Sequence, residues 1–204
     1  MLYAIQSTGN KTVTTQFVTT QCLTEEEIQK LKDSLDPSTW QDAKMYRSGH
    51  TEEQFAKINK DYRKNKMQHL FPSQQDGFPF PKISHIVSKM NDEFYKFDLR
   101  YINFMEDCPS VLKYTEGGKF NWHLDVGPNY ATRKISYTIQ LSDTDDYEGG
   151  DLEFFNGEEK RKDPNLRKRG NIIMFPAYTW HRVTPVTKGT RYALVGWVHG
   201  PTFR

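Results

Sequence analysis

The hydrophobic pattern changes its period about halfway along the 204 residues. Near the start, polar and apolar residues alternate up to Phe17 and Val18, which predicts a strand. Apolar residues at helical spacing then predict an amphipathic helix. We expect it to begin after Thr24, with Glu27 completing a capping box, and to end before Pro37.

Four more segments complete the first half of the chain. A second strand is expected over residues 41–46, and residues 51–67 are interpreted as a helix followed by a flexible connection. Residues 72–81 carry Pro, Gly, Ser and Gln and predict a loop. A third helix is expected over residues 81–99, where apolar residues recur at helical spacing.

The second half has a different pattern, in which short β-branched and aromatic runs alternate with turn residues. The expected strands cover residues 111–114, 119–123, 134–141, 151–155, 171–175, 181–185 and 192–198. This order predicts a mainly β fold with supporting α-helices, a jelly roll or double-stranded β-helix buttressed by helices on one outer face. We expect one domain over residues 1–204, with helical support in about 1–100 and the β core in about 101–204.

Composition predicts a globular chain but selects no partner. Hydrophobic residues make up 36% and aromatic residues 14%, and the formal charge is +2. That field is too weak to predict a nucleic-acid or membrane partner. Cys22 and Cys108 have no metal-type spacing, so neither a disulfide framework nor a zinc site is predicted. We find no signal peptide and no apolar run of spanning length, and we expect a cytoplasmic protein.

Three residues have the chemistry of a metal site. His123 and Asp125 are two apart, so on an extended chain both side chains leave the same face. Alone, such a pair is more often hydrogen-bonded than metal-binding. His181 follows an apolar strand and a turn, and it can return to the same cavity. Two imidazoles and one carboxylate leave three adjacent positions open on an ion, as in non-haem iron(II) oxygenases.

Arg191 lies ten residues after His181, in a turn that leads into the last expected strand. A surface ion pair is the usual fate of an arginine. Its place between a candidate ligand and an inward-facing strand favours a different role. A fixed guanidinium there can bind a carboxylate through two hydrogen bonds.

These residues belong to a longer ordered pattern. Its segments are Tyr114-x-x-Gly117-x-x-Phe120-x-x-His123-x-Asp125, then Arg133 and Ser136 through Leu141, Tyr147-x-Gly149-Gly150-x-Leu152, Gly170-x-Ile172-x-x-Phe175-Pro176, His181-Arg182-Val183-Thr184-Pro185-Val186 and Gly189-x-Arg191. With this pattern, residues 114–197 resemble the prolyl 4-hydroxylase-like branch of the iron(II)/2-oxoglutarate-dependent dioxygenases. A match in order over this length is more specific than any single motif.

The resemblance implies that His123, Asp125 and His181 bind iron(II) and that Arg191 binds the distal carboxylate of 2-oxoglutarate. It also implies a reaction that consumes 2-oxoglutarate and O2, releases succinate and CO2, and hydroxylates an unactivated carbon, with ascorbate as an accessory reductant. Iron follows from the reaction class, because manganese, cobalt and nickel accept similar ligands.

Two further groups of residues are expected near the cosubstrate. Four polar residues either face it or take part in ordinary cross-strand packing: Tyr114, Ser136, Thr138 and Gln140. Four apolar residues either line the pocket or serve only the core: Leu152, Val183, Val195 and Trp197. The remaining histidines are interpreted as surface or structural residues, with His50 in a loop that can cover the site: His50, His69, His85 and His199.

The expected substrate is a prolyl residue in a peptide or protein, by analogy with the resembling family. Residues 46–80 would then form a lid over the site. The same chemistry on a free amino acid or another small metabolite is an open alternative. Repair of an alkylated nucleobase would require a basic groove, which the near-neutral charge does not support. A jelly-roll binding module without catalysis is the alternative from a different class. The sequence sets no oligomeric state.

Overall fold

Two antiparallel sheets form the centre of the protein in the computed structural model, which describes residues 16–43, 61–155 and 163–203. The larger sheet has seven strands, in the order β1-β10-β7-β13-β5-β4-β2. In that order, their bounds are Val18–Gln21, Asn171–Pro176, Arg133–Gln140, Arg191–His199, Ser110–Tyr114, Lys66–His69 and Gln41–Asp42. Most of its strands are neighbours in space but distant in sequence, as a jelly roll requires.

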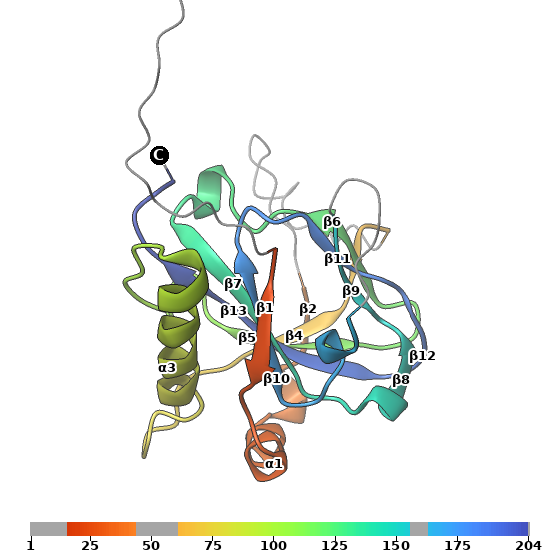
Figure 1. Ribbon diagram of the computed structural model, residues 1–204. Coiled ribbons are helices and arrows are strands. Elements are labelled where there is room, and N and C mark those ends of the chain that lie inside the picture. Colours follow the sequence, from red (N-terminus) through yellow and green to blue (C-terminus); the bar gives the residue numbers. More distant parts are fainter. Residues whose placement is uncertain (1–15, 44–60, 156–162, 204) are drawn as a thin grey trace, which may run out of the picture.

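The smaller sheet lies across from the larger one, with β6, β9 and β11 at the upper right of Figure 1. Its order is β3-β6-β11-β9, with bounds Arg63–Lys64, Lys119–His123, His181–Val183 and Leu152–Phe154. A separate two-stranded sheet pairs β12, Val186–Gly189, with β8, Tyr147–Gly149. Gly149 makes this approach possible, because its φ is +66° and a Cβ there would lie 2.2 Å from the Pro185 carbonyl oxygen.

Two helices support the larger sheet, α1 at Glu25–Asp33 and α3 at Phe80–Met90 (Figure 1). α1 begins at a capping box in which Thr24 and Glu27 exchange side-chain and backbone hydrogen bonds. α3 continues into one π-helical turn, Asn91–Tyr95. Short 3-10 turns lie at Pro37–Thr39, Pro128–Tyr130, Thr144–Asp146 and Pro164–Leu166. No helix in the described ranges is long and apolar enough to cross a membrane.

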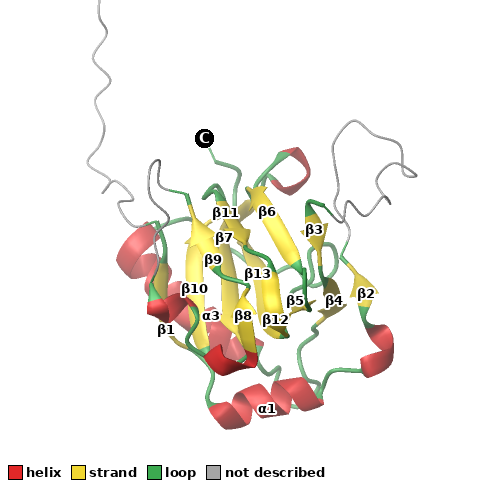
Figure 2. Cartoon of the chain, turned by 90° about the vertical axis from the view of Figure 1, so that its right-hand side faces the viewer, coloured by secondary structure: helices red, strands yellow, loops and turns green. Residues whose placement is uncertain are grey.

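Each face of the larger sheet has its own apolar core. The outer core joins α1 and α3 to alternate strand residues: Ile28, Leu31, Ile83, Val87, Val111, Ile135, Ile139, Ile172 and Leu194. The inner core fills the space between the two sheets: Phe17, Leu112, Tyr114, Leu152, Phe154, Ile173, Phe175 and Val183. Strand β7 contributes Ile135 and Ile139 to the outer core, whereas the polar side chains of Ser136 and Thr138 point inward. Figure 2 shows the sheets turned by 90° with α1 below them.

Replacing Ile28 by alanine is expected to lower the free energy of unfolding by about 2–5 kcal/mol, because Ile28 is fully buried between α1 and the sheet. In a chain of this size, the melting temperature should fall by roughly 4–20 °C. Thermal unfolding followed by circular dichroism measures the change. Gln29→Ala on the exposed side of the same helix is the matched control, and an equal loss in both variants would contradict this account of the outer core.

The jelly-roll prediction is confirmed, with the helices against one outer face. All seven strands expected in the second half are present, with bounds shifted by up to two residues. The loop predicted for residues 72–81 also agrees with the structure, since only its last two residues belong to the first turn of α3. The short strands β8 and β12 were not predicted from the sequence, because turn glycines interrupt them.

Two helix predictions are wrong in the described residues. Residues 63–64 and 66–67, predicted to belong to a helix or its flexible connection, lie in strands β3 and β4, because each strand pairs with a strand of the β core. Residues 51–60 of the region interpreted as a helix and a flexible connection, together with His50, lie outside the described residues. The third helix stops at Tyr95 instead of reaching residue 99. The Asn91 side chain bonds the backbone N–H and C=O of Phe97, and Lys96 takes a left-handed conformation.

Candidate functional site

Three potential metal ligands meet at one end of the smaller sheet. His123 is the last residue of β6, His181 is the first of β11, and the two are directly paired across these strands. Asp125 follows His123 by two residues in the next turn. Its Oδ1 lies 3.6 Å from His123 Nε2, and its Oδ2 lies 3.6 Å from His181 Nε2. One donor atom from each residue lies within 4.8 Å of the other two, so the three can share one ion.

Both imidazoles are oriented by the main chain. His123 Nδ1 lies 2.7 Å from the carbonyl oxygen of Asn121, and His181 Nδ1 lies 2.9 Å from that of Thr179. A carbonyl oxygen only accepts, so each Nδ1 carries the proton and donates. Each Nε2 is then left with a lone pair that faces Asp125. Outer partners of this kind fix the tautomer and direction of a metal-binding histidine.

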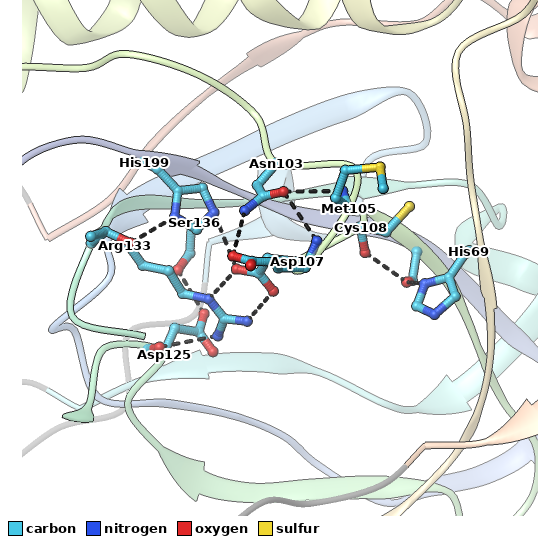
Figure 3. Close-up of polar contacts among 12 residues, drawn as sticks. His69, Asn103, Met105, Asp107, Cys108, Asp125, Arg133, Ser136 and His199 are labelled. Atoms are coloured by element: carbon cyan, nitrogen blue, oxygen red, sulfur yellow. Dashed lines mark hydrogen bonds and ion pairs between the residues drawn. The ribbon is translucent and has the colours of Figure 1, made fainter. Parts of the chain in front are cut away.

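Asp125 is held at its carboxylate and at its backbone (Figure 3). Ser136 Oγ donates to Oδ2 at 2.6 Å, and the Arg133 guanidinium donates to the backbone oxygen at 3.1 Å. The backbone N–H donates to the Ala177 carbonyl at 3.0 Å. These contacts leave the side chain little freedom to turn away from the two imidazoles.

The electrostatics of this cluster favour a neutral His123 imidazole beside a charged Asp125 carboxylate. Burial lowers the pKa of His123, and His181 next to it lowers it further, against the opposing effect of Asp125. Burial alone would raise the pKa of Asp125. The two imidazoles, the Arg133 guanidinium and the Ser136 hydrogen bond outweigh burial and lower that pKa below its usual range. An unprotonated nitrogen of His123 and a carboxylate oxygen of Asp125 are therefore available as donors at neutral pH.

The donor set fits iron(II). Two imidazole nitrogens and one carboxylate are the ligands of non-haem iron(II) oxygenases, and they occupy one side of the ion. In this protein the three donors line a cavity that residues of the larger sheet also line, so a small molecule in the cavity can reach an ion bound there. Within the part of the chain that the structure describes, no cysteine joins the cluster to select a softer metal.

Arg191 lies inside the molecule, at the start of β13 and opposite Tyr114 of β5. Its side chain is 2% exposed, and its guanidinium lies 5.3 Å from the centre of the Tyr114 ring. One Nη donates to Gln140 Oε1 at 3.0 Å, whereas Nε has no hydrogen-bond partner among the described residues. A buried cation with an unsatisfied donor indicates an anionic ligand.

A cavity of about 640 Å³ connects the metal cluster to Arg191. Of the residues predicted from the sequence, it is lined by His123, Asp125, His181, Arg191, Tyr114, Ser136, Thr138, Leu152, Val183, Val195 and Trp197. Gln140 is not among the described residues that line it. Its amide accepts from Arg191 and donates to the Leu166 carbonyl, so it holds Arg191 from behind.

Other cavity residues were not predicted. Arg63 of β3 lies over the ring of Phe120, and that ring stacks on His123 with centroids 3.6 Å apart. Asp107, in the loop before β5, pairs with Arg133. Neither has a spacing motif in the sequence, and only strand pairing brings them here. His199, expected at the surface or in a structural role, is 3% exposed at the edge of this Asp107 cluster.

Known proteins share both the sequence and the fold. The profile of the 2OG-Fe(II) oxygenase superfamily matches residues 109–199. A PKHD-type hydroxylase from Nitrobacter winogradskyi is 31% identical over 187 residues, covering 88% of this chain and 76% of that protein. The chain belongs to the 2OG-Fe(II) oxygenase superfamily.

Further known proteins are similar to this oxygenase in sequence or in fold. A PKHD-type hydroxylase from Pseudomonas fluorescens is 28% identical over 190 residues, covering 85% of this chain and 74% of that protein. Two solved structures share the fold with TM-scores of 0.65. One is a Pseudomonas putida prolyl-4-hydroxylase, 14% identical, covering 92% of this chain and 94% of that one. The other is a Trichoplax adhaerens prolyl hydroxylase in complex with a hypoxia inducible factor peptide fragment, 18% identical, covering 91% and 84%.

Membership of the family sets the cofactors of the oxygenase. It is an oxidoreductase that uses iron(II), 2-oxoglutarate and O2, and the cluster of His123, Asp125 and His181 is its candidate iron site. The non-catalytic binding module is therefore the weaker alternative.

Proposed function

We propose that this oxygenase hydroxylates a prolyl residue in a peptide or protein, releasing succinate and CO2. The observation that carries the proposal is the single cavity that joins three metal-type donors at one end to a buried, partly unsatisfied arginine at the other. A 2-oxo acid that chelates the metal and also carries a distal carboxylate would need both ends of this cavity at once. We also propose that residues 1–204 act as one domain.

In this proposal His123, Asp125 and His181 hold iron(II), which supplies the activation of O2 coupled to decarboxylation of the 2-oxo acid. Arg191 binds the distal carboxylate of 2-oxoglutarate through charge-assisted hydrogen bonds. Gln140 keeps that guanidinium in place. Thr138 and Tyr114 line the space between the two ends, where burial excludes water and strengthens each polar contact.

The substrate would enter on the side of the metal away from Arg191. The cavity there is lined by the rings of Phe120, Tyr130 and Trp197. Ring atoms at the cavity wall can give apolar contacts to a pyrrolidine ring, whose C–H bonds need close placement but no hydrogen bond. The cavity lining also includes Met67 and His69 of β4, the strand next to the edge strand β2 of the larger sheet. The solved prolyl hydroxylases of this fold, one with a peptide bound, support a peptide substrate here.

Succinate formation from 2-oxoglutarate, measured with iron(II) and ascorbate under air, tests the proposal. Turnover is expected to be slow alone and to rise at least about 10-fold with a proline-containing peptide, since bound substrate positions the target bond. The same peptide with each proline replaced by alanine is the matched control. Mass spectrometry should find one added oxygen atom, 16 Da, on the proline peptide.

The alternatives give different results. Equal turnover with both peptides, together with stimulation by free amino acids, would move the substrate to small metabolites. Stimulation by alkylated oligonucleotides alone would favour nucleobase repair. Absence of both turnover and iron-dependent 2-oxoglutarate binding would leave a binding module as the better account.

A further inference from the structure

Arg133 connects the turn that carries Asp125 to the rest of the core (Figure 3). It is the first residue of β7 and is 6% exposed. Its Nη1 donates to the backbone oxygen of Asp125 at 3.1 Å, eight residues earlier in the chain. Its guanidinium lies between two rings, 3.8 Å from the centre of Tyr130 and 3.6 Å from that of Trp197. The side chain thus closes the turn between the Asp125 segment and β7.

Asp107 fixes the other side of this guanidinium. Its Oδ2 accepts from Arg133 Nε at 2.6 Å, and its Oδ1 accepts from Nη2, so the pair is bidentate. Asp107 is 8% exposed, and His199 Nε2 at the end of β13 lies 3.2 Å from its Oδ2. Thr132 bonds the other nitrogen of His199. Three distant segments therefore meet at one buried carboxylate.

We propose that Arg133 and Asp107 are positioning residues that set the direction of the Asp125 carboxylate toward the metal. This rests on the metal site of the proposed function. Asp107 orients the Arg133 guanidinium, and Arg133 holds the Asp125 backbone from which the carboxylate projects. Neither residue is among the metal ligands, and the hydrogen bond from Arg133 to the Asp125 backbone oxygen is the contact that would fix the orientation.

The geometry favours positioning over a purely structural ion pair. A buried pair costs several kcal/mol of desolvation per ion, and an apolar pair of similar volume often stabilises a fold equally well or better. Fold stability alone therefore does not require these charges. What an apolar pair cannot supply is the donor to the Asp125 carbonyl. Bidentate pairing also fixes the plane of the guanidinium, which a single contact would not.

The double variant Arg133→Met, Asp107→Leu separates the two roles, because it removes both charges together and leaves no unpaired ion. Cobalt(II) is the probe, titrated into the metal-free full-length chain without 2-oxoglutarate. The dissociation constant is expected to rise about 10- to 100-fold, the cost of losing an outer partner of a metal ligand. The cobalt absorption bands should shift, since they report ligand geometry.

Two companion variants make the test decisive. Arg133→Lys keeps the charge and one donor, and it should recover part of the lost affinity. Lys82→Met removes an ion pair with Glu27 between α1 and α3 on the outer face, and it should leave cobalt binding unchanged. If the double variant does not fold, Arg133→Lys alone must still show weaker binding and shifted bands.

The outcomes also separate this inference from the proposed function. Cobalt binding by the wild type that is lost in His123→Ala establishes the metal site. With that established, unchanged affinity and unchanged bands in the folded Arg133 variants would overturn the positioning role. No cobalt binding by the wild type would instead count against the proposed function itself.

Discussion

Replacing His181 by alanine is expected to reduce iron-dependent succinate formation to background. His181 is buried at the start of β11, and its Nε2 faces the Asp125 carboxylate while Nδ1 is bonded to the main chain. No other imidazole of the described residues lies within the cluster to replace it. Changing only an outer partner of a metal ligand costs about 10- to 100-fold, so loss of a ligand should cost at least about 100-fold.

Two measurements on His181→Ala check the result, iron(II) binding by calorimetry and succinate release by chromatography. His85→Ala is the matched control, because His85 is exposed on α3 and has no contact with the cavity. Circular dichroism should show that both variants keep the β fold. Full turnover by folded His181→Ala at low iron(II) concentration would remove His181 from the metal site.

Replacing Arg191 by methionine is expected to weaken 2-oxoglutarate binding by about 10- to 100-fold, with little effect on metal affinity. Hydrogen bonds to a charged group contribute about 1.5–3 kcal/mol, and each 1.4 kcal/mol is a factor of ten. Methionine fills much of the same volume and leaves no second charge unpaired, because the partner of Arg191 is the neutral amide of Gln140. The loss should appear in the KM for 2-oxoglutarate more than in kcat at saturation.

The KM for 2-oxoglutarate in a succinate assay measures this effect, with manganese(II) binding as a second readout. Lys188→Met removes a cation three residues earlier, where Lys188 forms an exposed ion pair with Glu148. It should leave the KM unchanged. An equal KM in Arg191→Met and Lys188→Met would place the distal carboxylate elsewhere in the cavity.

Most of the β core and the three residues of the candidate metal cluster could be predicted from the sequence. His123 and Asp125 share a strand face by their spacing, and His181 begins a strand whose apolar approach is visible in the sequence. The second half of the chain is regular because each strand alternates or is apolar throughout. Spacing alone did not connect these residues with Arg191. The resemblance in ordered motifs implied that all four belong to one site.

What the sequence could not supply depends on pairing between distant segments. Residues 63–69 are polar or charged apart from Met67, and only the partners β5 and β6 make strands of β3 and β4. Asp107 reaches Arg133 because β5 and β7 both flank β13, a neighbour relation that no local pattern encodes. The early end of the third helix depends on one side chain, Asn91, that bonds the backbone six residues later.

In the middle of β7, neighbouring residues serve opposite faces of the sheet. Odd-numbered Ile135 and Ile139 belong to the helix-covered core, and even-numbered Ser136 and Thr138 face the cavity. Substitutions at even positions can therefore alter selectivity while the helix packing that sets stability is left intact. Insertion of one residue would exchange the faces and lose both properties together. This strand can vary in its residues but not in its length.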